Sequence, residues 1–196
     1  MRTHATNTWR RIVILGAVIS LVIVALQPGS SASKQVGFKV TTVFLVRHAN
    51  RADEPRQDPP LNDKGVSRSH ELARLLGSSG IKAIYTSQFL RTKQTAEPLA
   101  RLLGVTVTPM TLKSNPTNPR LVSEQSTTEI IEKILARPGE TSLVIGHSNS
   151  VPDVIKMLGG DMVPVIDEKK FDDLFVVAVY AKGKAKVVHM KYGSAE

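Results

Sequence analysis

The chain has 196 residues, of which 41% are hydrophobic and 22% are charged, a composition typical of a folded globular protein. Its formal net charge of +9 favours anionic ligands. Aromatic residues make up only 5% and no run of Lys and Arg is interleaved with them, which argues against nucleic-acid binding. The absence of cysteine excludes disulfides, thiolate catalysis and cysteine-ligated zinc sites.

Residues 1–32 have the three-part layout of an export signal. A polar, cationic start is followed by an apolar run from Ile12 to Leu26 and then by small, helix-breaking residues, so cleavage after Ala32 is expected. The apolar run is shorter than the ~20 residues that span a bilayer, which favours a cleaved signal. A retained membrane tether is the alternative. On either interpretation, residues 33–39 are a linker, and residues 40–196 form one domain that is exported to the periplasm, secreted, or held at the membrane.

The domain alternates predicted strands and helices. Strands are expected at residues 40–46, 81–85, 105–110, 141–147, 174–180 and 185–189. Helices are expected to begin after Asn62, at Thr86-Ser87, near Ser126 and at Ser150. This alternation predicts a three-layer α/β/α sandwich with a mostly parallel sheet, to which the last two strands add an antiparallel edge.

Two of the predicted helices carry apolar stripes that should face the sheet. Their members are Val66, Leu72, Leu75 and Leu76 in the first helix, and Leu90, Ala96, Leu99, Leu102 and Leu103 in the second. The helix at Ser150 has an acid three residues later, Asp153, so these two residues are expected to form a capping box.

Polar side chains follow three of the predicted strands. Arg47 and His48 come after the first strand, Ser87 and Arg91 after the second, and His147 and Ser148 after the fourth. Because ligands bind beyond the carboxyl ends of parallel strands, these groups should meet at one edge of the sheet. Arginines, histidines and helix N-termini together make a site for a multiply charged oxyanion and would repel a metal cation.

The motifs "LVRHA", "YTSQFLRTKQTA" and "VIGHS" occur in this order, each at its proper strand end, and "PPLNDKG" lies at the start of the first predicted helix. These motifs resemble those of the histidine phosphatase superfamily, in its small branch without a large cap domain. The resemblance runs from about Val40 to Val188 and implies the phosphoglycerate mutase-like fold. It also implies a cofactor-independent phosphatase that hydrolyses phosphomonoesters, or another phosphorylated small molecule, without a metal ion.

By this resemblance, His48 would attack phosphorus and form a phosphohistidine that water hydrolyses. Arg47 and Arg91 would bind the phosphoryl oxygens, and His147, best as an imidazolium, would be a further donor to them. Asn50, Arg51 and Ser148 lie where they could contact the substrate.

The acid that protonates the leaving oxygen matches no motif. Glu54 and Asp53 can be proposed because they follow His48 closely, and Asp153 because it follows His147, although the capping box is the favoured role for Asp153. The loop of residues 113–120 contains no acid.

Three alternatives remain open. A missing acid would suit a substrate with a good leaving group, such as phosphohistidine, or a non-catalytic protein that binds phosphate or a phosphosugar. Phosphomutase activity is disfavoured because the short loops leave little room for a cap that excludes water.

Overall fold

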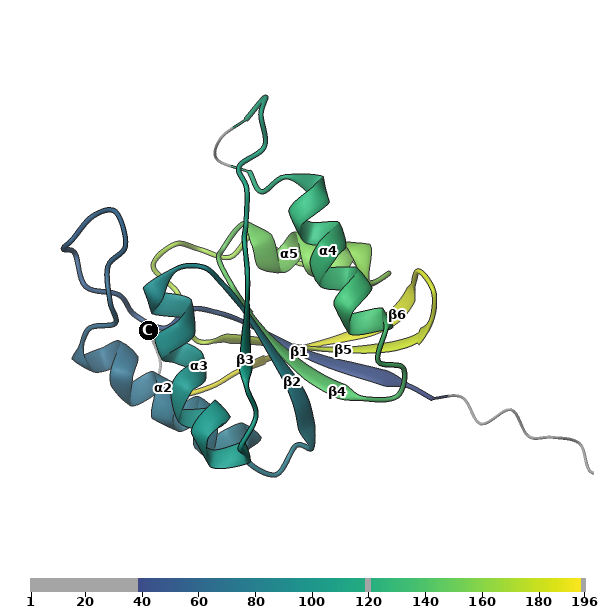
Figure 1. Cartoon of the computed structure of the whole chain (residues 1–196), viewed down its shortest axis with the longest axis horizontal. Helices are drawn as coiled ribbons and strands as arrows, with labels where there is room; N and C mark the ends of the chain where they lie inside the picture. Colours follow the sequence, from purple (N-terminus) through teal and green to yellow (C-terminus); the bar gives the residue numbers. More distant parts are fainter. Residues whose placement is uncertain (1–38, 119–120, 195–196) are drawn as a thin grey trace, which may run out of the picture. The chain divides into compact units, whose positions relative to one another are not determined.

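The computed structural model of the protein describes residues 39–118 and 121–194. The predicted export signal, residues 1–32, and all of the predicted linker except Lys39 lie outside the described residues. The elements are β1 (Thr41–Arg47), α2 (Asp63–Leu76), β2 (Ile81–Ser87), α3 (Leu90–Leu103), β3 (Val107–Met110), α4 (Glu124–Leu135), β4 (Thr141–Gly146), α5 (Ser150–Met157), β5 (Asp173–Ala181) and β6 (Lys184–Lys191). Strands and helices alternate from β1 to α5, as the sequence predicts (Figure 1).

The strands of the described part form one sheet in the order β3-β2-β4-β1-β5-β6. Neighbours from β3 to β1 are parallel, whereas β5 is antiparallel to both β1 and β6. The prediction of a mostly parallel sheet with an antiparallel edge is therefore confirmed. Val43, Leu45 and Leu143 in the central strands are fully buried, as expected for strands that are covered on both faces.

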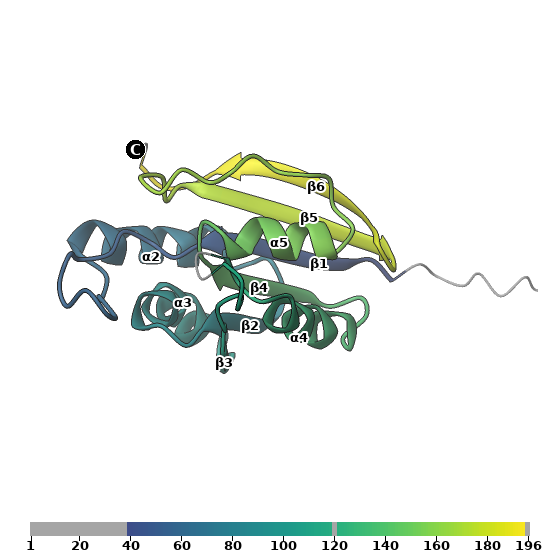
Figure 2. The same ribbon diagram turned by 90° about the horizontal axis from the view of Figure 1, so that it is seen from above.

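Helices α2 and α3 cover one face of this sheet, and α4 and α5 cover the other (Figure 2). Successive residues of β4 point to opposite faces, so Leu143 packs with α2 and α3 while Val144 packs with α4 and α5. The predicted three-layer α/β/α sandwich is confirmed. Within residues 39–118 and 121–194, every helix is too short or too polar to cross a bilayer.

Helix α2 begins as predicted and buries Leu72 and Leu76 of the predicted apolar stripe, but not its other two members. The Asn62 side chain caps it by accepting a hydrogen bond from Gly65 N–H at 2.9 Å. Val66 and Leu75, expected in the core, are each 45% exposed. The helix is turned so that Gly65 lies against the backbone of Asn50, where a Cβ atom would come within 2.0 Å of the Asn50 carbonyl oxygen. This close approach, rather than the apolar stripe alone, decides which residues are buried.

Helix α3 begins three residues later than predicted. Thr86 and Ser87 continue β2, where they pair with Pro109 and Met110 of β3 in the parallel ladder. The N-cap residue is Phe89, which has no side chain that can accept a hydrogen bond from the helix. Ala96 and Leu99 are fully buried as predicted, whereas Leu102, also expected in the core, is 62% exposed.

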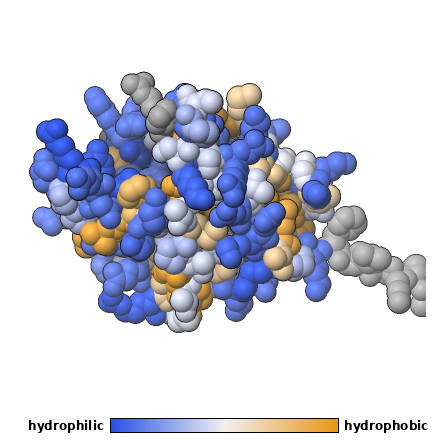
Figure 3. All heavy atoms as spheres, turned by 45° about the horizontal axis from the view of Figure 1, so that its top comes forward, coloured by the Kyte–Doolittle hydropathy of each residue, from blue (hydrophilic) through white to orange (hydrophobic). Residues whose placement is uncertain are grey.

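The surface carries its hydrophobic residues in small, separate areas on the face shown in Figure 3, which is otherwise mostly hydrophilic. Such scattered apolar side chains are normal for a folded domain. This face therefore offers no extended apolar docking surface within the described residues.

Candidate active site

Three parallel strands end level with one another and bring their polar residues together. Arg47 is the last residue of β1 and pairs in register with Gly146 of β4, and Thr86 of β2 pairs with Ile145. A pocket of about 360 Å³ lies beyond these ends, and its lining includes Arg47, His48, Arg91, His147 and Ser148. The predicted meeting of these residues at one edge of the sheet is confirmed.

The buried imidazole of His48 has a defined tautomer. The side chain is at the end of β1, where the residue is only 3% exposed and its backbone N–H donates to the Gly146 carbonyl at 2.9 Å. Its Nδ1 lies 2.8 Å from the carbonyl oxygen of Ala49. Because a carbonyl oxygen can only accept, Nδ1 carries the proton, and the lone pair of the neutral ring is on Nε2.

Burial and nearby positive charge keep both histidines of the pocket neutral. Burial lowers the pKa of His48 to about 2, with smaller contributions in the same direction from His147, Arg47 and Arg91. Burial, together with Arg91 and Arg47, lowers the pKa of His147 to about 3. The expectation that His147 is an imidazolium concerns a pocket that holds an anion, and in the protein alone the ring is neutral. A bound dianion would favour its protonation.

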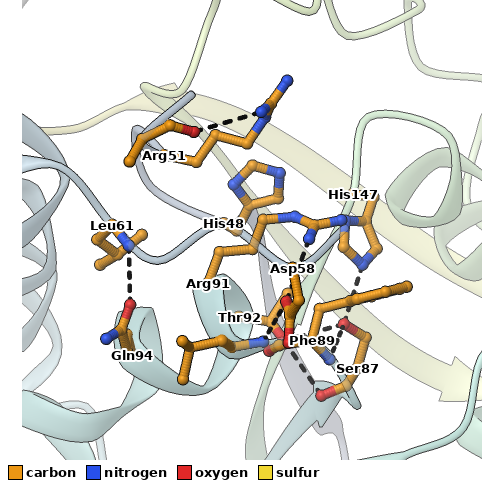
Figure 4. A network of polar contacts seen from close by, with 12 residues as sticks. His48, Arg51, Asp58, Leu61, Ser87, Phe89, Arg91, Thr92, Gln94 and His147 are labelled. Atoms are coloured by element: carbon orange, nitrogen blue, oxygen red, sulfur yellow. Dashed lines mark hydrogen bonds and ion pairs between the residues drawn. The ribbon is translucent and has the colours of Figure 1, made fainter. Parts of the chain in front are cut away.

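His147 is held by contacts on both its backbone and its ring. Its backbone N–H donates to Ser150 Oγ, and its Nε2 lies 2.9 Å from Ser87 Oγ (Figure 4). The Ser150 hydroxyl is therefore occupied by His147, and the N-cap residue of α5 is Asn149. The predicted capping box of Ser150 and Asp153 is wrong, because the Ser150 hydroxyl accepts its hydrogen bond from the His147 N–H in the turn after β4.

Arg47 contacts the loop between α5 and β5. Its Nη1 donates to the backbone carbonyls of Asp167 at 3.0 Å and Lys170 at 3.1 Å. The guanidinium lies 4.2 Å from the centre of the Phe171 ring. Burial lowers the pKa of Arg47 to about 10, which leaves it charged at neutral pH.

Arg91 stands in the first turn of α3, and its side chain converges with those of His48 and His147 (Figure 4). Its guanidinium lies 4.4 Å from the centre of the Phe89 ring, and its Nη1 is 3.6 Å from Asp58 Oδ1. The same Asp58 oxygen accepts a hydrogen bond from the Leu90 N–H at 2.9 Å. Asp58 thus supplies the cap that Phe89 cannot, a role that the sequence does not reveal because the two segments are distant in the chain.

Two buried donors in the pocket lack a partner in the described part of the chain. The Nε atoms of Arg47 and Arg91 are both buried and make no hydrogen bond there. Since buried polar groups are almost always hydrogen-bonded, both guanidinium groups retain a donor that a bound acceptor could use.

The three predicted substrate-binding residues divide into two groups. Arg51 and Ser148 line the pocket, as expected. Asn50 does not line it: the residue is buried, and its Oδ1 accepts a hydrogen bond from Arg68 Nε at 3.0 Å. Asn50 therefore links the loop after His48 to helix α2, and the structure places it outside the lining of the pocket.

None of the three proposed acids lines the pocket. Asp53 and Glu54 point outward on the loop after β1, and Glu54, 72% exposed in its side chain, pairs with Arg56. Asp153 is half-buried on α5, and burial raises its pKa. Among the described residues, the only carboxylate in the lining is that of Glu168, which follows α5 in a segment without a recognisable motif.

The lining is strongly cationic. Its basic residues are Arg47, Arg51, Arg56, Arg91 and Lys113. Within the described ranges, no three His, Asp or Glu side chains are grouped so that they could hold a metal ion. The arrangement suits a phosphate or a similar oxyanion bound by guanidinium groups.

Comparison with known families agrees with this geometry. A sequence model of the "Histidine phosphatase superfamily (branch 1)" matches residues 43–112, a segment that contains Arg47, His48 and Arg91. The resemblance to the histidine phosphatase superfamily is confirmed. His147 lies outside the matched segment, and the register of β4 against β1 is what brings it to the same pocket.

Curated relatives match only part of the chain. "Probable phosphoglycerate mutase GpmB" from Yersinia enterocolitica is 38% identical over 85 residues, which cover 40% of this chain and 36% of that protein. The corresponding protein of Yersinia pestis is 34% identical over the same share. The chain thus spans about a third of the length of the curated relatives it matches.

Solved structures share the fold at low sequence identity. The protein histidine phosphatase SixA, complexed with tungstate, has a TM-score of 0.61 and 19% identity, covering 76% of this chain and 96% of SixA. A mycobacterial glucosyl-3-phosphoglycerate phosphatase has a TM-score of 0.60 and 12% identity over 79% and 100% of the two chains. A phosphoglycerate mutase from Bacillus anthracis has a TM-score of 0.60 and 16% identity over 78% and 93%. These likenesses establish the phosphoglycerate mutase-like fold.

Proposed function

We propose that this protein is a phosphatase that hydrolyses phosphomonoesters, or another phosphorylated small molecule, through a phosphohistidine on His48. No metal or organic cofactor takes part. The observation that carries the proposal is the state of the His48 ring. Its Nδ1–H is bound to the Ala49 carbonyl, so a neutral imidazole presents its Nε2 lone pair in a pocket that Arg47 and Arg91 also line.

The two arginines supply the binding site for the phosphoryl group. Their buried Nε donors have no partner in the described residues, and phosphate oxygens would satisfy both with charge-assisted hydrogen bonds. The Nε2 of His147 is held by Ser87 Oγ, so Nδ1 is the ring nitrogen that His147 can offer to the phosphoryl group. Arg47 is buried and Arg91 and His147 are partly buried, which strengthens these contacts because water screens them poorly there.

Phosphoryl transfer requires little more than this arrangement. The Nε2 lone pair attacks phosphorus in line with the leaving oxygen, and the negative charge that spreads over the other three oxygens is stabilised by the guanidinium groups. Water then attacks the phosphohistidine and releases inorganic phosphate. The same donors are in place for both steps, so no reorganisation of the pocket is needed between them.

Phosphomutase activity is the alternative that the names of the curated relatives favour. A mutase would pass the phosphoryl group from His48 to a second hydroxyl group rather than to water. The structural likeness to SixA makes a phosphorylated histidine a further substrate to test. A non-catalytic phosphate-binding protein would bind phosphate or vanadate without turnover.

The test is hydrolysis of p-nitrophenyl phosphate by the purified protein in the presence of EDTA. Wild type should release inorganic phosphate, and mass spectrometry should find the phosphoryl group on His48. His48→Ala should abolish turnover, while His70→Ala, which removes an exposed histidine of α2, should leave it unchanged. Full activity in His48→Ala, or loss of activity in EDTA that zinc or magnesium restores, would refute the proposal.

We also propose that the domain is exported, either to the periplasm or into the medium, or is held at the membrane by residues 12–26. The polar, apolar and small-residue segments of residues 1–32 support this proposal. Cell fractionation and the N-terminal sequence of the native protein test it. A cytoplasmic protein with an intact N-terminus would contradict it, and an intact N-terminus in the membrane fraction would select the tether.

A further inference from the structure

Glu168 lies at the pocket without a role in binding or attacking the phosphoryl group. It lies on the segment between α5 and β5 and provides the only carboxylate in the lining of the pocket among the described residues. All other charged side chains of that lining are basic. A carboxylate among these basic side chains weakens the attraction of the pocket for an anionic substrate, which points to a role other than binding.

The turn that carries Glu168 is attached to the phosphate-binding arginine. Arg47 Nη1 donates to the carbonyl oxygens of Asp167 and Lys170, the residues that flank the turn. The turn is closed by the Lys170 N–H, which donates to the Asp167 carbonyl at 2.9 Å, and by the Lys169 N–H, which donates to Asp167 Oδ1 at 2.8 Å. The position of Glu168 is therefore coupled to that of the Arg47 guanidinium.

The carboxylate itself is directed to the β4 side of the pocket. Ser148 Oγ, in the residue after His147, lies 3.5 Å from Glu168 Oε1. Among the charged groups around Arg47, Glu168 has the largest effect on its pKa, which it raises against the effect of burial. One carboxylate oxygen thus faces Ser148, and the group as a whole borders the space between the two strand ends that hold the phosphoryl-binding residues.

We propose that Glu168 is the proton donor to the leaving group in the phosphatase reaction, an inference that rests on the proposed function of His48. As Nε2 of His48 bonds to phosphorus, the bond from phosphorus to the ester oxygen breaks, and that oxygen takes the proton of the Glu168 carboxylic acid. The products of this step are an alcohol, a phosphohistidine and the Glu168 carboxylate. The carboxylate then accepts a proton from the attacking water, which yields inorganic phosphate, neutral His48 and the acid again.

The other nearby acids are excluded as proton donors by their contacts or their positions. Asp58 is engaged by Arg91 and by the Leu90 N–H at the start of α3. Asp53, Glu54 and Asp153 do not line the pocket. Glu168 therefore takes the role of the acid, for which the sequence offered Glu54, Asp53 and Asp153 as candidates.

The test compares leaving groups in Glu168→Gln, with the phosphorylation of His48 measured in single turnovers by rapid mixing. An alkoxide needs a proton to leave, whereas p-nitrophenolate does not. The variant should phosphorylate His48 from an alkyl phosphate about 10²-fold or more slowly than wild type, but from p-nitrophenyl phosphate within about threefold of wild type. Asp161→Asn, on the same segment and exposed, should match wild type with both substrates.

Each other outcome overturns the assignment. An equal loss with both substrates would mean that Glu168 positions Arg47 rather than donates a proton, and no loss with either would mean that it does neither. A selective loss in Glu54→Gln would return the role to Glu54. If His48 is not phosphorylated in wild type, the proposed function itself fails, a result distinct from every outcome of the Glu168 comparison.

Discussion

Acidification should destabilise the folded protein through its two buried histidines. The pKa of His48 is about 2 and that of His147 about 3, against an ordinary value of 6.5. Between these values the unfolded chain binds protons that the folded chain does not. The stability that neutral burial contributes is therefore complete above pH 6.5 and is lost as the pH falls below that value towards the folded pKa values.

The magnitude follows from the unfolded state alone. A histidine that stays neutral in the folded protein costs about 2 kcal/mol of unfolding free energy when the pH falls from about 8 to about 5. This figure does not depend on how far the folded pKa lies below the final pH. His48 and His147 together should account for about 4 kcal/mol, which is a large fraction of the about 5–15 kcal/mol that stabilises a typical domain.

Urea denaturation at the two pH values measures this loss. His48→Asn and His147→Asn should each remove about half of the difference, because each leaves one histidine to be protonated on unfolding. His70→Asn, on the exposed surface of α2, should retain the whole difference. The ion pair of His189 with Asp173 is present in every variant, so its contribution cancels in the comparison.

The reasoning would be refuted by a wild type that is equally stable at both pH values. It would also be refuted if His70→Asn removed as much of the pH dependence as His48→Asn does. The first result would mean that burial does not hold the imidazoles of the pocket neutral at about pH 5, and the second that the pH dependence is not specific to the pocket.

Substitutions at two positions test how the loop after His48 is held. Gly65→Ala should lower the free energy of unfolding by about 3 kcal/mol or more, because the added Cβ would meet the Asn50 carbonyl oxygen at 2.0 Å. The hydrolysis of p-nitrophenyl phosphate should fall as well. An unchanged midpoint of urea denaturation would contradict this prediction. Arg68→Met should cost about 3 kcal/mol by leaving Asn50 Oδ1 and the carbonyls of Tyr192 and Ser194 without their donor. Arg68→Lys should restore only part of that loss in the same assay, since an ammonium group cannot span three separate acceptors.

Several features of the fold could be predicted because their signals are local. The alternation of strands and helices follows from hydrophobic periodicity, and Asn62 caps α2 through residues only three positions apart. The face that a helix buries could be predicted only in part, since Leu72 and Leu76 of α2 are buried as expected but the other two residues of the stripe are not. Val66 and Leu75 have the right spacing, yet the contact of Gly65 with Asn50, which joins two different segments, turns them towards solvent.

The capping errors have the same origin. Ser150 and Asp153 have the sequence of a capping box, but the Ser150 hydroxyl accepts from His147 N–H, and α3 receives its cap from Asp58 in a remote loop. A sequence pattern shows which groups can form a hydrogen bond. Competing partners that arrive from elsewhere in the chain decide which bond forms.

The sequence by itself determined the core of the site. Arg47, His48, Arg91 and His147 follow strands or open a helix, and parallel strands bring their carboxyl ends to one edge whatever the loops do. Only the tertiary structure decided which carboxylate joins them. Glu168 reaches the pocket because Arg47 binds the backbone carbonyls on either side of it, and since every residue type carries a carbonyl, such a contact leaves no trace in the sequence.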